Sequence, residues 1–403
     1  MTGRADALAT AAPAASPGGP APEARGDHRG SALPTYSMIA TRFMELRKRR
    51  GLMITLALVT IGIPSVFLVI RLLLHAFAPK SYGPAGGYSI YTALVPGVLY
   101  IFGFIVAATL GATAGSVDLT EGMFRHLVVT GRSRLALYLA RIPAGLAIIV
   151  PLVAAGFSVV CVVCVFAAPT RLSYSGVNVA PNLSRAGFET WAGEHPDEVI
   201  CNFGFRIGPS SPLNAAVSTV SCANGPGAGP VSINGGPATP GNQPQASAAQ
   251  IARAARLIAE MDYGDYSRQF LYPSTSLMIK SGLWLELEAV VGFIVALGLG
   301  SLTGQRTVAV IVMIVLEVVL TPLLARARLA HLSNLQRSVV GLATAHLAPG
   351  GLPVFGGGGG GPPGASANPR LLPESTTVAV CVIVAWLVVW SVLGAWRMMT
   401  RDA

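Results

Sequence analysis

The chain has 403 residues, of which 52% are hydrophobic and only 11% are charged, and its formal net charge is +10 at pH 7. Soluble domains carry about a quarter charged residues, so this composition excludes an ordinary soluble protein and indicates an integral membrane protein. A positive charge can indicate nucleic-acid binding, but here the arginines cluster beside apolar runs, which is typical of membrane orientation signals. We therefore expect no nucleic-acid partner.

The chain begins with a polar stretch and then becomes basic. Residues 1–37 are rich in Ala, Pro and Gly without hydrophobic periodicity, which predicts a disordered cytoplasmic tail. The basic residues that follow are Arg42, Arg47, Lys48, Arg49 and Arg50. The apolar run 52–77 comes next and is long enough to cross a hydrocarbon core of about 30 Å. It predicts a first transmembrane helix rather than a signal peptide, because the run is too long and the tail before it too extended.

Five further apolar runs predict the remaining spans, and together they give the expected fold class, an all-α membrane protein with six transmembrane helices. These runs cover residues 91–114, 135–167, 282–302, 308–325 and 376–396. We expect one group of spans within 38–167 and another within 277–403. Basic residues beside the short loops place both termini in the cytoplasm and the chain in the cell membrane.

Residues 118–141 form a polar island between two long apolar runs, and its first part, 118–131, has a helical pattern. Apolar side chains recur every four residues, and polar side chains occupy the other faces. The residues of interest are Leu119, Glu121, Met123, Phe124, Arg125 and Leu127. The helix itself would have about ten residues and a length of about 15 Å, and such a helix is marginal alone in water. We therefore expect an amphipathic cytoplasmic helix that lies on the membrane surface or on a partner.

The largest hydrophilic insertion, residues 168–276, is predicted to form an extracytoplasmic loop domain with a short amphipathic helix at 251–261. Cys201 and Cys222 both fall in this loop, where oxidation persists, so we expect a disulfide. Closing about twenty residues would stabilise the domain by about 3 kcal/mol. The alternative is two free thiols in a loosely ordered loop.

Residues 326–375 lie between the fifth and sixth runs and are also expected outside. Their first part, 326–347, has leucines at helical spacing, and a Gly run at 356–361 follows. The helical part should rest on the membrane or pack on the spans.

Three acidic residues in the second half are candidates for a translocation path. Glu317 falls in the middle of the fifth run, where a buried carboxylate is costly and usually belongs to a pathway or faces a partner. The alternative is that Glu317 is protonated or hydrogen-bonded to a neighbouring helix. Glu286 and Glu288 are expected near the outer end of the fourth span, as wet interfacial groups.

No motif in the sequence indicates catalysis, a cofactor or a metal. The nearest approach to a P-loop, residues 300–307, lacks the lysine that would bind phosphate, and is better interpreted as a Gly-rich turn. The histidines are scattered singly, and Cys161 and Cys164 lie on one apolar helix without a companion pair. We expect a protein that is not an enzyme.

Two stretches resemble a known family. Residues 121–134, EGMFRHLVVTGRSR, resemble the coupling region between spans two and three in the membrane subunit of ABC-2-type transporters. Residues 282–306 and the TPLL sequence at 321–324 are similar to the corresponding spans of actinobacterial members. The resemblance covers about residues 40–400 in topology.

This resemblance implies a bacterial inner-membrane permease that exports or otherwise translocates a solute with ATP hydrolysed by a separate ATPase subunit, and the direction of transport stays open. Two permease chains, identical or different, would assemble with two nucleotide-binding chains, and the 118–131 helix would contact the ATPase. The substrate stays open. An alternative of another class is a membrane-anchored scaffold or receptor that acts through residues 168–276.

Overall fold

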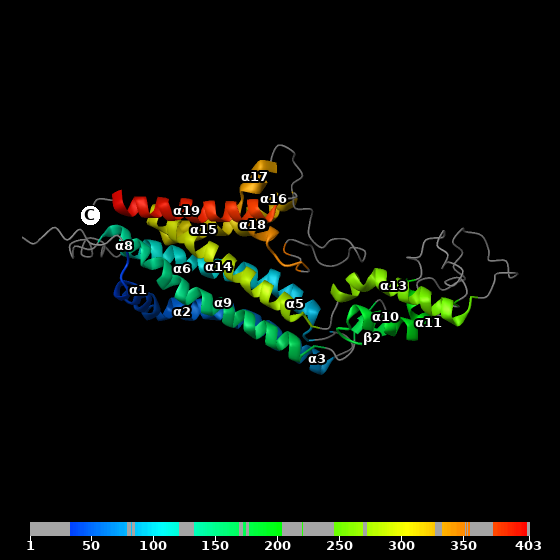
Figure 1. Cartoon of the computed structure of the whole chain (residues 1–403). Helices are drawn as coiled ribbons and strands as arrows, with labels where there is room; N and C mark the ends of the chain where they lie inside the picture. Colours follow the sequence, from blue (N-terminus) through cyan, green and yellow to red (C-terminus); the bar gives the residue numbers. More distant parts are fainter. Residues whose placement is uncertain are drawn as a thin grey trace, which may run out of the picture.

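The protein is described here from a computed structural model. The described residues are 33–78, 82, 85–120, 133–168, 172–174, 177–203, 220, 246–268, 272–326, 333–350, 352, 354 and 374–400. Within them, six helices are long and apolar enough to cross a membrane, which confirms the predicted six-span, all-α membrane protein. The spans are Arg50–Phe77, Tyr88–Val117, Arg134–Phe166, Thr275–Thr303, Arg306–Ala325 and Thr376–Thr400. They lie side by side in one elongated bundle (Figure 1).

Several spans are built from more than one helical element, and some of these elements are π-helical. Span one consists of α2 (Arg50–Ala57), the π-helix η1 (Leu58–Gly62) and α3 (Ile63–Phe77). Span two consists of α5 (Tyr88–Leu94), η2 (Val95–Leu99) and α6 (Tyr100–Thr120), and span three of α8 (Arg134–Leu139) and α9 (Arg141–Phe166). Span four is α14 (Thr275–Thr303), span five is α15 (Arg306–Ile314), η4 (Val315–Leu320) and α16 (Thr321–Arg326), and span six is α19 (Thr376–Thr400).

Helix α14 is the centre of the bundle and is the most buried span. It packs against α6, α9 and α19. Its contact with α6 is close because small residues line it: a Cβ on Gly111 would lie 2.2 Å from the Phe293 carbonyl oxygen, and one on Gly300 2.7 Å from that of Ala112. Glycine at such contacts lets the backbones of membrane helices approach.

The predicted start of span four was wrong by seven residues, since α14 begins at Thr275 rather than at 282. The Ser274 side chain accepts a hydrogen bond from the Leu277 amide and caps the helix, an N-cap role that suits serine. The added turns contain Lys280, which hydropathy alone assigns to the loop. Residues predicted near the end of this span therefore lie in its middle.

A helix that the sequence analysis missed, α1 (Tyr36–Lys48), precedes span one. Its buried residues Met38, Arg42 and Leu46 recur every four positions, and it packs against α9. The chain bends at Arg49, whose ψ of 68° lies outside the helical region. In Figure 1, α1 and α8 lie with the C-terminus at one end of the bundle, called here the α1 end.

The opposite end of the bundle carries a small folded unit, the loop domain, formed by described residues between 172 and 268 (Figure 1). It contains the antiparallel pair β1 (Leu172–Tyr174) and β2 (Val177–Val179) and the helices α10 (Arg185–Glu194), α11 (Pro196–Phe203) and α13 (Ala248–Arg268). Helix α13 is longer than the 251–261 segment predicted. The loop domain has its own core, in which Phe188 stacks on Tyr266 with ring centroids 4.2 Å apart.

Two short helices, α17 (Ser333–Ser338) and α18 (Val340–His346), connect spans five and six. All residues of α18 from Val340 to Ala345 are buried, and the helix packs against α19 and α14. The indole nitrogen of Trp386 donates to the Ser338 carbonyl at 2.8 Å, and that of Trp284 to the Thr344 carbonyl at 3.0 Å. Of the two predicted placements, packing on the spans is the one observed for α18.

Candidate functional site

The fifth span buries an acidic residue inside the bundle. Glu317 lies in η4 and its exposed fraction is 2%. The Tyr100 hydroxyl donates a hydrogen bond to Glu317 Oε1, and the Thr321 hydroxyl donates to Oε2 at 3.4 Å. Glu317 is thus hydrogen-bonded to a neighbouring helix, which was one of the two alternatives stated for this residue. Its role in a translocation path stays a prediction.

A second buried acid, Glu288, corrects the prediction of a wet interfacial group. It sits near the middle of α14 and its exposed fraction is 2%. The reason is the early start of α14 together with the cover that α18 provides over Trp284, one helical turn before Glu288. Its Oε1 atom has no hydrogen-bond partner among the described residues.

Glu286, the third predicted path residue, is only partly exposed. Both of its carboxylate oxygens are buried without a hydrogen-bond partner in the part of the chain that the structure describes. Because it is two positions from Glu288, it points to a different face of α14. The structure therefore does not bring it together with Glu317.

Helix α18 closes the site around Glu317. The Gly341 backbone lies against the carboxylate, and a Cβ at this position would be 2.3 Å from Glu317 Oε2. The Tyr100 ring stacks on Trp284 with centroids 5.1 Å apart and an interplanar angle of 9°. Residues from α6, α14, η4 and α18 thus meet at one place, which we call the Glu288–Glu317 cluster.

A cavity of about 70 Å³ adjoins this cluster. It is lined by Pro96, Tyr100, Ile101, Phe104, Glu317, Val318, Pro322 and Val354. Since a water occupies about 30 Å³ and a drug-sized ligand needs about 300 Å³ or more, the cavity has room for water or a small cation but not for a large solute. Passage of a larger solute here requires the surrounding helices to separate.

The electrostatics of the cluster are unfavourable for two ionised acids. Glu288 and Glu317 are close enough to interact electrostatically, and both are buried. In a medium of low dielectric constant, like charges repel strongly, so a proton or another cation is needed to neutralise one of them. No Lys or Arg is among the described residues lining the adjoining cavity.

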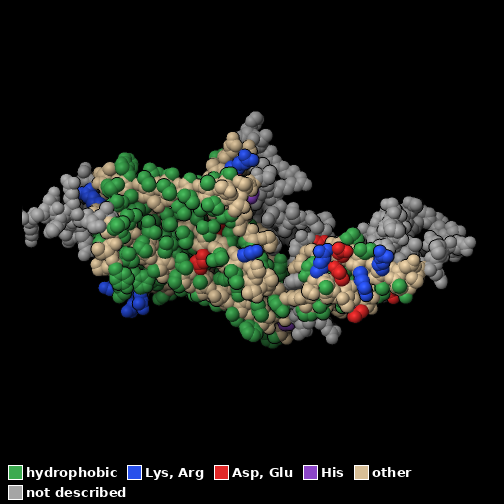
Figure 2. Space-filling model, viewed as in Figure 1, with side chains coloured by type: hydrophobic (Ala, Val, Ile, Leu, Met, Phe, Trp, Pro, Cys, Tyr) green, Lys and Arg blue, Asp and Glu red, His purple; other side chains and the backbone are tan. Residues whose placement is uncertain are grey.

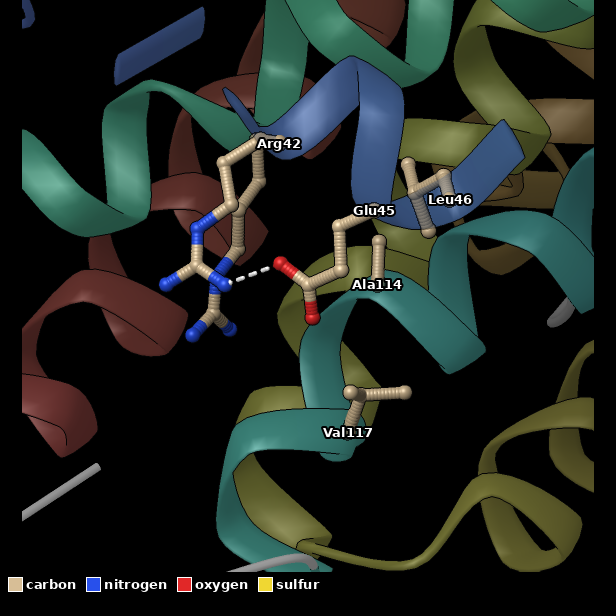
Figure 3. A pocket seen from close by; sticks show the side chains of 6 residues that line it. Arg42, Glu45, Leu46, Ala114 and Val117 are labelled. Atoms are coloured by element: carbon tan, nitrogen blue, oxygen red, sulfur yellow. Dashed lines mark hydrogen bonds and ion pairs between the residues drawn. The ribbon is translucent and has the colours of Figure 1, made fainter. Parts of the chain in front are cut away.

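A second charged cluster lies at the α1 end and has the opposite character. It surrounds a cavity of about 10 Å³ lined by Arg42, Glu45, Leu46, Ala114, Val117 and Arg141. Arg42 Nη1 donates to Glu45 Oε2 at 2.6 Å (Figure 3). Arg141, with an exposed fraction of 2%, donates to the Gly115 carbonyl at 3.1 Å. Arg42 is paired with a carboxylate and Arg141 with a carbonyl. We call Arg42, Glu45 and Arg141 the inner cluster and interpret it as structural.

Most of the predicted coupling residues belong to a stretch of the chain that the structure does not describe. Glu121, Met123, Phe124, Arg125 and Leu127 lie outside the described residues. Leu119 belongs to α6, but its side chain is not among those described. The coupling helix therefore stays a prediction.

The predicted disulfide also stays a prediction. Cys201 lies in α11, whereas Cys222 lies outside the described residues. Elsewhere, Cys161, Cys164 and Cys381 are free thiols. Among the described residues, no group of three or more His, Cys, Asp or Glu side chains could hold a metal ion.

Sequence reasoning found Glu317 but missed its neighbours. Tyr100, Trp284, Gly341 and Thr344 come from three segments distant in the sequence, and no local pattern marks any of them as polar partners. The one local signal is Pro96, because a proline removes an α-helical hydrogen bond and marks an irregular turn before Tyr100, but it does not indicate a partner for Glu317.

We compared the chain with protein-family models, with curated proteins and with solved structures, and found no match in any of the three.

Proposed function

We propose that this chain is the permease subunit of an ABC-2-type transporter, which moves a solute outward with ATP hydrolysed by a separate ATPase subunit. The observation that carries the transport part of the proposal is the Glu288–Glu317 cluster. Buried acids inside a span bundle are costly and are typical of substrate or ion pathways. Two such acids are difficult to explain by stability alone, since Glu288 has an oxygen with no partner among the described residues and Glu317 lines a cavity.

The ATPase part of the proposal rests on the resemblance at residues 121–134. The basic residues of α1 and α2 gather at the same end of the bundle as α8, which follows this stretch in the chain (Figures 1 and 2). A basic end favours the cytoplasmic side, where an ATPase subunit would bind. Both termini would then be cytoplasmic, and the loop domain would lie outside.

The cluster would take part in the transport cycle through its position between four elements. Separation of span two from span five, which supply most of the lining, would open the 70 Å³ cavity and expose Glu317. Conversely, a cation or a proton at the acids would favour the closed arrangement seen here. ATP hydrolysis would supply the free energy that drives the change.

The test is co-purification of this chain with a candidate ATPase subunit from the same organism. Phe124→Asp should weaken the complex by a few kcal/mol, because aromatic anchors dominate interfaces, and ATP turnover in liposomes should fall with it. Phe166→Asp is the matched control, since Phe166 is exposed at the other end of span three. Equal ATPase recovery and turnover for wild type and Phe124→Asp would reject the coupling assignment.

A scaffold or receptor function is the second candidate, and the separate core of the loop domain favours it. Replacing residues 172–268 by a short linker separates the two proposals. A permease should keep its ATPase partner and part of its ATP turnover after this replacement. A scaffold or receptor should lose its extracytoplasmic partner and show no ATPase dependence at all.

A further inference from the structure

An open groove lies where α1, α2 and α9 meet, outside the two clusters described above. Its volume is about 590 Å³, within the usual range for ligand sites. It is lined by Met44, Arg47, Lys48, Arg50, Met53, Ile54, Ala57 and Leu152. Figure 2 shows Lys and Arg side chains gathered at this end of the molecule, directly beside the hydrophobic surface of the bundle.

The local sequence produces this groove through the bend at Arg49. Helix α1 buries Met38, Arg42 and Leu46 and so leaves Arg47 and Lys48 exposed in its last turn. The span then starts with α2, and the groove lies between the end of one helix and the start of the next. The basic residues stand at its rim, and apolar residues of the span form its floor.

The rim has an excess of positive charge. Arg47, Lys48 and Arg50 are all exposed, and no carboxylate of the described residues forms an ion pair with them. Glu45, a nearby acid on α1, is already bound to Arg42 at 2.6 Å. Arg50 also begins α2, and the first turn of a helix favours an anion rather than a cation. The rim is therefore suited to an anionic group.

The floor has the complementary property. Met53, Ile54 and Ala57 belong to the first turns of span one, and the Ile54 side chain has an exposed fraction of 64%. Leu152 of α9 forms the opposite wall. An inorganic anion would leave this floor uncovered, whereas an amphiphile with an anionic head would cover both rim and floor.

We infer that the groove binds one anionic phospholipid, with its phosphate at Arg47, Lys48 and Arg50 and an acyl chain against Met53, Ile54, Ala57 and Leu152. Basic pockets beside transmembrane helices are suited to anionic lipid head groups, and each basic residue contributes about 1 kcal/mol near a membrane surface. The bound lipid bridges α1, the first span and α9, and couples the position of α1 to the lipid composition of its leaflet.

The experiment is native mass spectrometry of the full-length protein in detergent, titrated with dioleoyl phosphatidylglycerol or dioleoyl phosphatidylcholine. The wild type should bind phosphatidylglycerol preferentially. The double variant Arg47→Gln, Lys48→Gln should weaken the affinity for phosphatidylglycerol about 30-fold, which is about five-fold for each charge removed. Arg306→Gln, an exposed arginine at the same end of the bundle, should leave the affinity unchanged. Equal loss with Arg306→Gln would show an unspecific charge effect and overturn the site.

A second variant keeps every charge and fills the floor. Ala57→Phe should displace the acyl chain and weaken the binding of phosphatidylglycerol about as strongly as the loss of both charges does. Val319→Phe, at another exposed apolar position, should leave this binding unchanged. Glycerophosphoglycerol, the head group without acyl chains, should bind at least 100-fold more weakly than the lipid. Head-group binding equal to that of the lipid, or unchanged lipid binding by Ala57→Phe, would reduce the site to an anion contact and overturn the lipid assignment.

Discussion

The two charged clusters of the bundle differ in whether opposite charges are paired. The inner cluster at the α1 end pairs Arg42 with Glu45 and places Arg141 against a backbone carbonyl. The Glu288–Glu317 cluster instead collects two acids, of which Glu288 keeps one oxygen without a described partner. Opposite charges that satisfy each other hold helices together, whereas like charges in a low-dielectric interior cost stability and persist where function requires them.

The largest effect is expected from Arg141→Ala in the inner cluster. The change removes a buried, charged hydrogen bond to the Gly115 carbonyl and leaves a void, so the free energy of unfolding should fall by about 3 kcal/mol. Denaturant unfolding in detergent measures it. Arg134→Ala is the control, because the Arg134 bond to the Met399 carbonyl is exposed and should matter by under about 1 kcal/mol. Similar losses for both variants would contradict the structural role of Arg141.

Gly341→Ala should have the next largest effect and acts on the Glu288–Glu317 cluster. The new Cβ would lie 2.3 Å from Glu317 Oε2, so the carboxylate must move away from Tyr100. We expect a loss of about 2 kcal/mol in stability and, under the function proposed above, lower ATP turnover of the complex with the ATPase. Gly350→Ala, at a site with no atom within 4 Å of the added carbon, should be silent.

A double variant sharpens this prediction. If the contact with Glu317 causes the loss, Gly341→Ala combined with Glu317→Ser should regain most of the stability, because the shorter side chain leaves room for the methyl group. A coupling free energy near zero in the double-mutant cycle would show that Gly341 acts through another neighbour.

The smallest change in the free energy of unfolding is expected for Glu317→Gln. The sign of this change, compared with that of the same exchange at Glu45, distinguishes the two clusters. The amide can still accept a hydrogen bond from Tyr100, and the variant removes repulsion with Glu288, so stability should rise or change by less than about 0.5 kcal/mol. ATP turnover and transport should nevertheless fall. The same exchange at Glu45, whose side chain is 27% exposed, should destabilise by about 1 kcal/mol and leave turnover unchanged. If Glu317→Gln destabilised the protein as much as Glu45→Gln does, the proposed difference between the two clusters would be wrong.

The sequence predicted what depends on local composition. The six spans follow from hydropathy, and Glu317 was marked because its run is uniformly apolar. Glu288 was misplaced because its burial depends on the helix cap at Ser274 and on cover by α18, neither of which hydropathy detects. Helix α1 was missed although Met38, Arg42 and Leu46 share one face, because an arginine in the middle of that face interrupts its apolar pattern.

The neighbours of Glu317 were beyond sequence reasoning for a different reason. Tyr100 is 217 residues from Glu317 in the sequence, and Gly341 is about 20 residues from it. Only the packing of span two and α18 brings these residues together. Aromatic and glycine residues are common in membrane spans, so neither residue is distinctive by itself.

The π-helical elements beside the cluster have a mechanical consequence. A π-helical turn contains one residue more than an α-helical turn, and η2 and η4 place such turns directly before Tyr100 and around Glu317. Conversion of η4 to a regular α-helix would rotate the residues on its two sides by about 100° relative to each other. Spans two and five thus each contain an extra residue in the turn where their side chains meet. Loss of the π-helical turn in η4 would rotate Glu317 away from Tyr100 without unfolding either helix.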